Sequence, residues 1–100
     1  MKAAEFNQAF ATTIKWVNVH KDFEEVQVHV KYVIDNYADE KPFYCEVEVH
    51  NENGEIEKFQ NLFFESESKA KAHATSYKVA EMFAKKVGAE NVIWYKEVLK

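Results

Sequence analysis

Four histidines, one cysteine and 17 acidic residues are the side chains of this chain that could perform acid–base or metal chemistry. His29 and His50 fall on polar positions of two segments in which polar and apolar residues alternate. If those segments pair as neighbouring strands, the two rings can approach each other or Glu48, as an acid–base pair or a metal site would require. No His-X-His, His-X3-His or Cys-X2-Cys spacing occurs, however, and zinc requires three or four converging ligands. We therefore expect surface histidines, with no metal and no cofactor.

Nucleophilic catalysis has no sequence signature in this chain. Cys45 lies on the apolar phase of its segment, which indicates a buried, reduced thiol of the kind found in the cytosol. The chain has no Gly-X-Ser-X-Gly turn and no Gly-X4-Gly-Lys phosphate loop. The sequence therefore predicts no catalytic residues and no enzymatic activity.

The charge inventory is acidic and lacks arginine. All 13 basic residues are lysines, and the formal net charge is −4. Arginine is the usual residue for bidentate recognition of phosphates and guanines. Its absence argues against base-specific recognition of nucleic acid and against phosphoryl-transfer chemistry.

A carboxylate-rich ribbon is the surface to which we assign a function. Two carboxylates project from the polar side of one predicted strand, two follow the turn at Asn53-Gly54, and a tyrosine shares the polar phase. Such a surface would speed encounter with a basic protein, and the tyrosine would provide an aromatic anchor. The competing interpretation is a solvated strand face whose charges discourage aggregation. We predict partner binding by these residues, the acidic hairpin: Tyr44, Glu46, Glu48, Glu55 and Glu57.

A second charged surface is predicted near the carboxyl end of the chain. Lys71, Lys78 and Lys85 recur every seven residues and line one side of a predicted helix, the lysine stripe. Residues 68–74, which follow a three-stranded region, resemble the end of a double-stranded RNA-binding domain, where a Lys-rich helix start contacts phosphates. The negative net charge and the strand after the helix depart from that family. The stripe gives an alternative function, nucleic-acid binding, and its competing interpretation is a solvated helix face.

Alternation of apolar and polar residues predicts the strands. Residues 26–34 and 43–50 follow a period of two, which is typical of antiparallel strands with one buried face. The Asn53-Gly54 turn leads into a returning strand over 56–65, in which a bulge near 58–60 would rejoin two phases. A further strand is predicted over 92–98.

The first 20 residues can be interpreted in two ways. Strong helix formers over 3–11 predict a short helix, and the β-branched and aromatic residues of 12–20 predict a strand. The competing interpretation is one longer helix with a single apolar face, formed by Phe6, Phe10, Ile14 and Val17.

The second helix has clearer boundaries. Ser66 or Ser68 can cap its start, and Gly88 can end it after about Val87. We therefore predict one α+β domain over residues 1–100, with element order α-β-β-β-β-α-β. Its four- to five-stranded, mostly antiparallel sheet carries one long helix on one face and a short N-terminal helix. The predicted core includes Val28, Val30, Tyr32, Val47, Val49, Tyr77, Phe83 and Trp94.

Composition and surface together favour a soluble, cytoplasmic, non-catalytic domain that binds another protein with a basic surface. Small, acidic, arginine-free chains rich in aromatic residues resemble, in general character, phage-encoded proteins that inhibit host factors. We expect no membrane association and no nucleic-acid partner, and the sequence leaves a homodimer open. The alternatives are the nucleic-acid-binding module and a small enzyme or ligand-binding fold.

Overall fold

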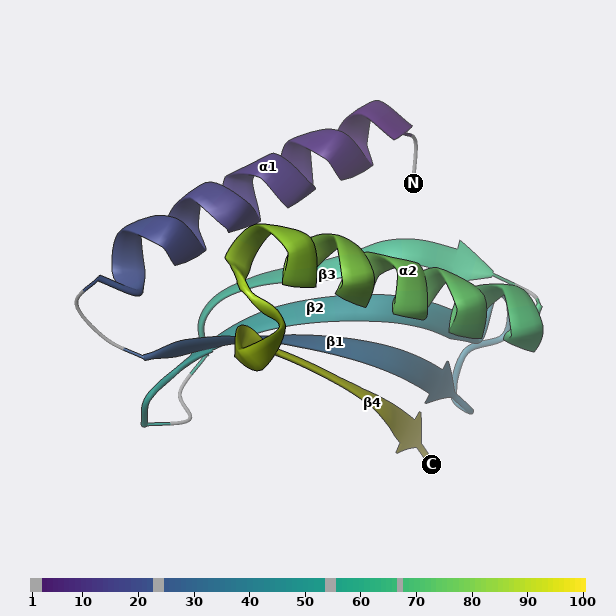
Figure 1. Cartoon of the computed structure of the whole chain (residues 1–100). Coiled ribbons are helices and arrows are strands. Elements are labelled where there is room, and N and C mark those ends of the chain that lie inside the picture. The colour runs from purple at the N-terminus through teal and green to yellow at the C-terminus, as the bar shows by residue number, and fades with distance from the viewer. Residues whose placement is uncertain (1–2, 23–24, 54–55, 67) are drawn as a thin grey trace.

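Four strands form a single sheet, and two helices lie on one of its faces (Figure 1). The computed structural model describes residues 3–22, 25–53, 56–66 and 68–100, with the backbone alone for residue 3 and for residues 56–66. The elements in chain order are α1 (Ala3–His20), β1 (Val26–Asp35), β2 (Phe43–Asn51), β3 (Ile56–Ser66), α2 (Lys69–Val87), the 3-10 helix η1 (Ala89–Asn91) and β4 (Val92–Leu99).

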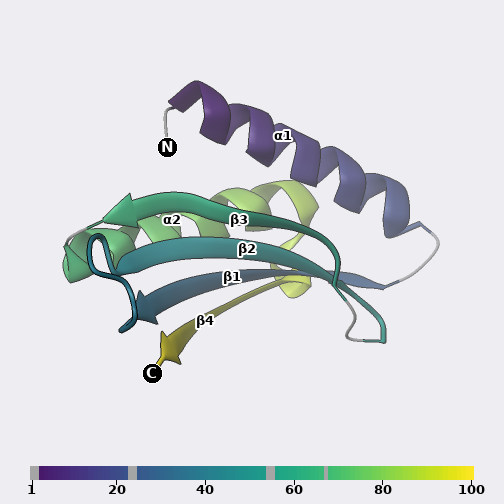
Figure 2. The same ribbon diagram turned by 180° about the vertical axis from the view of Figure 1, so that it is seen from behind.

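The sheet is mixed, with strand order β3-β2-β1-β4. Strand β2 is antiparallel to both of its neighbours, whereas β4 runs parallel to β1. Helix α2 lies above the sheet and carries the chain from β3 at one edge to β4 at the other (Figures 1 and 2). The predicted α+β class is therefore confirmed. Among the described helices, none is both long and apolar enough to cross a bilayer.

Helix α1 takes the place of the strand predicted over 12–20, so that prediction and the predicted element order are wrong. Apolar residues three or four positions apart give the helix one buried face, on which Phe6 and Val17 contribute to the core. The β-branched Thr13 is accommodated because its hydroxyl donates a 2.8 Å hydrogen bond to the Ala9 carbonyl. Burial of this face outweighs strand propensity, and the helix is 18 residues long rather than short.

Helix α2 begins and ends at predicted capping residues. The Ser68 hydroxyl accepts a 3.2 Å hydrogen bond from the Lys71 amide, which caps the first turn. Gly88 has a φ of 95°, and its amide donates to the Ala84 carbonyl. This positive φ is a backbone conformation that other residues rarely adopt, so the end of the helix requires glycine.

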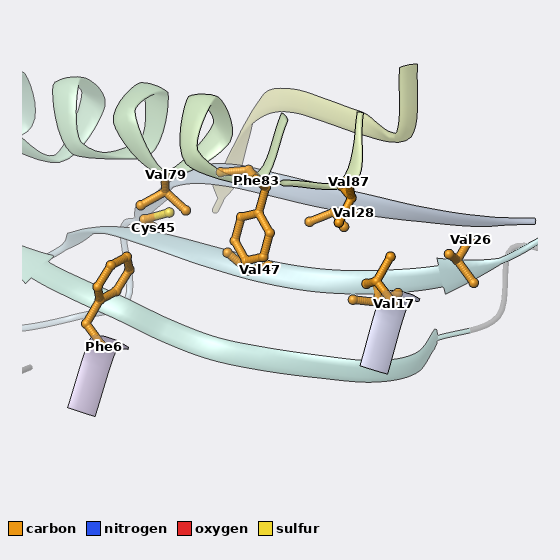
Figure 3. Close-up of a cluster of buried hydrophobic side chains, with 11 residues drawn as sticks. Phe6, Val17, Val26, Val28, Cys45, Val47, Val79, Phe83 and Val87 are labelled. Atoms are coloured by element: carbon orange, nitrogen blue, oxygen red, sulfur yellow. The ribbon is translucent and has the colours of Figure 1, made fainter. Parts of the chain in front are cut away.

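The core lies between the sheet and the two helices, where β1, β2 and α2 contribute most of the side chains (Figure 3). Trp94, predicted as core, packs against its margin. Tyr77 contradicts the prediction: it is 47% exposed, because it lies at that margin and stacks on Trp94 with ring centroids 4.3 Å apart. The other predicted core residues are confirmed as fully buried: Val28, Val30, Tyr32, Val47, Val49 and Phe83.

Replacing Val47 by Ala is expected to lower the free energy of unfolding by about 1–3 kcal/mol, measured by urea denaturation. Val47 is fully buried beneath α2, so the change removes two methyl groups from the core and leaves a cavity. Lys78→Ala on the exposed side of α2 is the control and should change stability by less than about 0.5 kcal/mol. A similarly small effect of Val47→Ala would contradict this placement of the core.

Candidate functional site

The face of the sheet that the helices leave uncovered carries a network of charged and aromatic side chains. Figures 1 and 2 show both helices on the opposite side. Residues of β1 and β2 alternate between the two faces, so the residues that alternate with the core valines Val28, Val30, Val47 and Val49 point away from the helices. We call this network the open-face cluster: His29, Lys31, Glu46, Glu48, His50, Tyr95 and Glu97.

Lys31 occupies the centre of the open-face cluster. Its ammonium nitrogen lies 2.5 Å from the Glu48 Oε1 and 3.3 Å from the Glu97 Oε2. The Glu46 Oε1 is 3.8 Å away, and the Tyr95 ring centroid is 6.0 Å away. Although it lies on the uncovered face, Lys31 is only 8% exposed, because these neighbours surround it. One ammonium group is thus shared by three carboxylates.

Strand register explains how this set assembles. Lys31 pairs directly with Glu46 across the antiparallel β1–β2 ladder, and Glu48 is its diagonal neighbour. On the other side Lys31 pairs with Tyr95 in the parallel β1–β4 ladder, and Glu97 lies two residues further along β4. The cluster therefore depends on all three strands.

The two histidines meet as the alternation of their strands predicts. Their rings stack with centroids 3.8 Å apart and planes 4° from parallel. The Nδ1 of His29 lies 3.2 Å from the Tyr95 hydroxyl, and the Nε2 of His50 lies 3.4 Å from the Glu48 Oε1. One nitrogen of each ring thus has a partner outside the stacked pair. Among the described residues, no group of three or more His, Cys, Asp or Glu side chains is arranged to hold a metal ion.

Charge pairing fixes the protonation states at the centre of the cluster. Burial raises the pKa of Glu48, but hydrogen bonds from Lys31 and His50 lower it by more, so the pKa falls below its usual value. Burial opposes charge on Lys31 too, yet the hydrogen bond to Glu48 and the nearby carboxylates raise its pKa above the usual value. The pKa of Glu46 is raised, chiefly by burial, although Lys31 opposes the shift. Lys31 and Glu48 therefore form a stable ion pair near neutral pH.

The environment of His29 shifts the titration of its imidazole. Its pKa is lowered from 6.5, first by burial and then by the charges of His50 and Lys31, while Glu48 opposes the shift. As the pH falls below about 6.5, the unfolded chain binds this proton before the folded chain does, and folded stability decreases. His29 is therefore neutral in the folded protein at pH 7.

We expect wild-type protein to lose stability between about pH 7.5 and pH 5.5, and the variant His29→Gln to lose less over the same range. Urea denaturation at both pH values measures the difference. His20→Gln is the control, since His20 lies at the end of α1, where its Nδ1 is 2.9 Å from the Trp16 carbonyl oxygen. An equal pH effect in wild type and His29→Gln would contradict a depressed pKa at His29.

The acidic hairpin is only partly contained in this site. Glu46 and Glu48 belong to the open-face cluster, and Tyr44 lies beside Val33 in the strand register. The competing interpretation, a solvated strand face, does not hold for Glu48, which is 9% exposed and paired with Lys31. Glu55 lies outside the described residues, and so does the side chain of Glu57. Partner binding by the hairpin stays a prediction.

The lysine stripe lies on the side of α2 that faces away from the sheet. Lys71, Lys78 and Lys85 are all exposed. Over the described residues their ammonium groups form no ion pair, in contrast to Lys31. This arrangement fits a solvated helix face as well as it fits a phosphate-binding one.

The cluster residues that sequence reasoning missed are Lys31, Tyr95 and Glu97. Lys31 occupies a polar position of β1, so a cross-strand ion pair with Glu46 or Glu48 could have been predicted once the strands were paired. Tyr95 and Glu97 offered no such signal, because only the position of β4 beside β1 brings them in.

Comparisons with protein-family models, curated proteins and solved structures found no match.

Proposed function

We propose that this chain is a small, non-catalytic protein-binding domain whose open-face cluster binds a basic segment of a partner protein. The observation that carries the proposal is the excess of carboxylates over ammonium groups in the open-face cluster. Three carboxylates surround a single ammonium group there, and the helices cover only the other face.

Two of these carboxylates remain available to a partner. Glu48 is committed to Lys31, but the side chains of Glu46 and Glu97 are 21% and 40% exposed. A lysine or arginine from a partner could contact either of them and complete the charge balance of the face. Such complementary charges mainly raise the rate of association and fix the orientation of the partner.

Apolar and aromatic groups flank the charges. Tyr44 is half-buried on the same face, and Ile93 is 37% exposed at the adjacent edge strand β4. Binding energy at protein interfaces is concentrated in such aromatic and apolar groups, with charged groups around them. The combination supports a protein partner over a free cation.

A catalytic role has weaker support. Cys45 is fully buried, and burial followed by the charge of Glu46 raises the pKa of its thiol to about 12. The thiol is therefore protonated at neutral pH and unsuited to nucleophilic attack. Glu48, the carboxylate closest to Lys31, is held in an ion pair with its ammonium group.

Site-specific crosslinking tests the location of the docking surface. The photoreactive residue benzoylphenylalanine replaces Tyr44 in one protein and Lys78 in a control protein, and both are irradiated in extract of the native cell. We expect one protein to be crosslinked from position 44 and not from position 78. After purification, the crosslinked partner protein should bind the wild-type chain without irradiation. Crosslinks to protein from position 78 alone would contradict the proposal.

Charge removal then tests the role of the cluster. The variant Glu46→Gln/Glu97→Gln should slow association with the purified partner at low salt and have little effect at high salt. Glu81→Gln/Glu90→Gln, which removes the same charge from exposed positions, is the matched control. Equal association rates for the two double variants would refute docking on the open face.

Nucleic-acid binding by the lysine stripe is the outcome that would replace this proposal. Binding that falls steeply with salt and is lost in Lys71→Gln/Lys78→Gln/Lys85→Gln would identify that function. The net charge of −4 makes us expect no such binding near physiological ionic strength.

A further inference from the structure

A hollow of about 500 Å³ lies on the helix-covered side of the sheet, at the start of α2. Figure 1 shows α2 beginning at the end of the sheet where β1 and β4 finish. This α2 hollow is on the opposite side of the sheet from the open-face cluster. Its lining residues come from three elements: Tyr32, Lys69, Ala70, His73 and Lys96.

The buried hydroxyl of Tyr32 is the observation that points to a ligand. Tyr32 is 1% exposed, and its hydroxyl has no hydrogen-bond partner among the described residues. A buried polar group is normally satisfied, because leaving it unpaired costs free energy. Burial also raises the pKa of Tyr32, which keeps the phenol protonated and able to donate. Over the part of the chain that the structure describes, the hollow therefore contains a donor that lacks an acceptor.

Positive charge gathers around that donor. Lys96 is the direct neighbour of Tyr32 in the β1–β4 register, and Lys69 is the first residue of α2. The first turn of α2 contains no acidic residue, although helix starts usually favour acidic side chains. Ser68 caps the Lys71 amide, whereas the amides of Lys69 and Ala70 have no acceptor within the helix. The start of α2 and the ammonium groups of Lys69 and Lys96 together favour binding of an anion in the hollow.

We propose that the α2 hollow binds the oxyanion of a small organic molecule, a phosphate or a carboxylate group. The anion would accept hydrogen bonds from the Tyr32 hydroxyl and the Ala70 amide, and the ammonium groups of Lys69 and Lys96 would neutralise its charge. No residue of the proposed protein-docking surface takes part, so each proposal can fail without the other.

The dimensions favour an organic anion over a free ion. A hollow of about 500 Å³ is far larger than a single oxyanion and falls within the range of small-molecule sites. His73 forms one wall, and its ring contacts those of Tyr77 and Trp94 at centroid distances of 5.0 and 5.4 Å. An aromatic or apolar group attached to the anion can pack against this wall.

Nuclear magnetic resonance titration of the full chain tests the site, with inorganic phosphate, phenyl phosphate and benzoate as probes. We expect saturable shifts of the Lys69 and Ala70 amide signals, and tighter binding of phenyl phosphate than of inorganic phosphate. Whether phenyl phosphate or benzoate binds more tightly decides between a phosphate and a carboxylate ligand. Shifts that do not saturate with any of the three probes would overturn the proposal.

Variants locate the binding groups. Tyr32→Phe removes only the hydroxyl. It should lower the affinity for the tightest-binding probe by about tenfold, the usual scale for a hydrogen bond to a charged group. The double variant Lys69→Gln/Lys96→Gln should lower the affinity for the same probe at least as much. The matched control Lys78→Gln/Lys85→Gln removes equal charge from exposed positions of α2 and should leave affinity nearly unchanged. Unchanged affinity in Tyr32→Phe, or equal losses in both lysine variants, would refute a specific site.

Discussion

Replacing Lys31 by Met is expected to lower the free energy of unfolding at pH 7 by about 2–4 kcal/mol. Methionine keeps most of the packing volume but leaves Glu48, which is 9% exposed, without the cation that lies 2.5 Å away in the wild type. Breaking a fully buried ion pair costs about 3–5 kcal/mol. We expect a smaller effect, because Glu46 and Glu97 retain contact with water. Urea denaturation measures the loss.

The pH dependence distinguishes this electrostatic effect from simple loss of packing. In wild type the pKa of Glu48 lies below 4.5, so its stabilising contribution persists at neutral pH and is lost as the pH falls through the lowered pKa. In Lys31→Met, burial without the ammonium raises that pKa, and protonation on acidification relieves the unpaired charge. The difference between the two proteins should therefore shrink from pH 7 to about pH 4.

Two further variants complete the test of Lys31. Lys78→Met, at an exposed position of α2, should change stability by less than about 0.5 kcal/mol. Lys31→Met/Glu48→Gln should recover part of the loss, because the uncompensated carboxylate is gone. A pH-independent loss that Glu48→Gln does not relieve would show that the Lys31 stem, and not its charge, stabilises the sheet.

The strands and the second helix could be predicted because their signals are local. Alternation with a period of two identifies β1 and β2 within one residue of their observed ends. Ser68 and Gly88 act through hydrogen bonds and backbone conformation of adjacent residues, so they mark α2 without reference to the rest of the fold.

Helix α1 shows where local signals fail. Its second half contains β-branched and aromatic residues that favour a strand, but Val17 is fully buried only if the helix continues. Whether these residues form a helix or a strand depends on the apolar surface that the rest of the chain presents to them. Local propensity carries no information about that surface. Phe6 and Val17 were visible as one face of a longer helix, and that competing interpretation is correct.

The open-face cluster could be predicted for β1 and β2 only. Once these strands are neighbours, alternation brings His29 and His50 together. The contribution of β4 depends on its parallel pairing with β1. That pairing is a long-range contact, which the crossover through α2 makes possible. Glu97 therefore enters the cluster from a strand whose own pattern gives no sign of its neighbour.

Replacing Phe83 by Ala is expected to have the largest effect on stability, a loss of about 3–5 kcal/mol in the free energy of unfolding. Phe83 is fully buried and lies among the core valines of the sheet (Figure 3). Its ring also contacts that of Phe10 in α1, with centroids 4.7 Å apart. Since the total free energy of unfolding of a small domain is only about 5–15 kcal/mol, the variant should unfold at a much lower urea concentration.

Hydrogen exchange shows whether Phe83 also holds α1 in place. Loss of the ring removes one of the contacts between α1 and α2, so amide protection in α1 should fall further than protection in β1 and β2. The neighbouring variant Met82→Ala is the control: Met82 is 37% exposed, and its truncation should cost less than about 1 kcal/mol. Equal costs for the two variants would contradict the position of Phe83 between α1 and the sheet. A uniform loss of protection would instead mean that α1 and the sheet unfold as one cooperative unit.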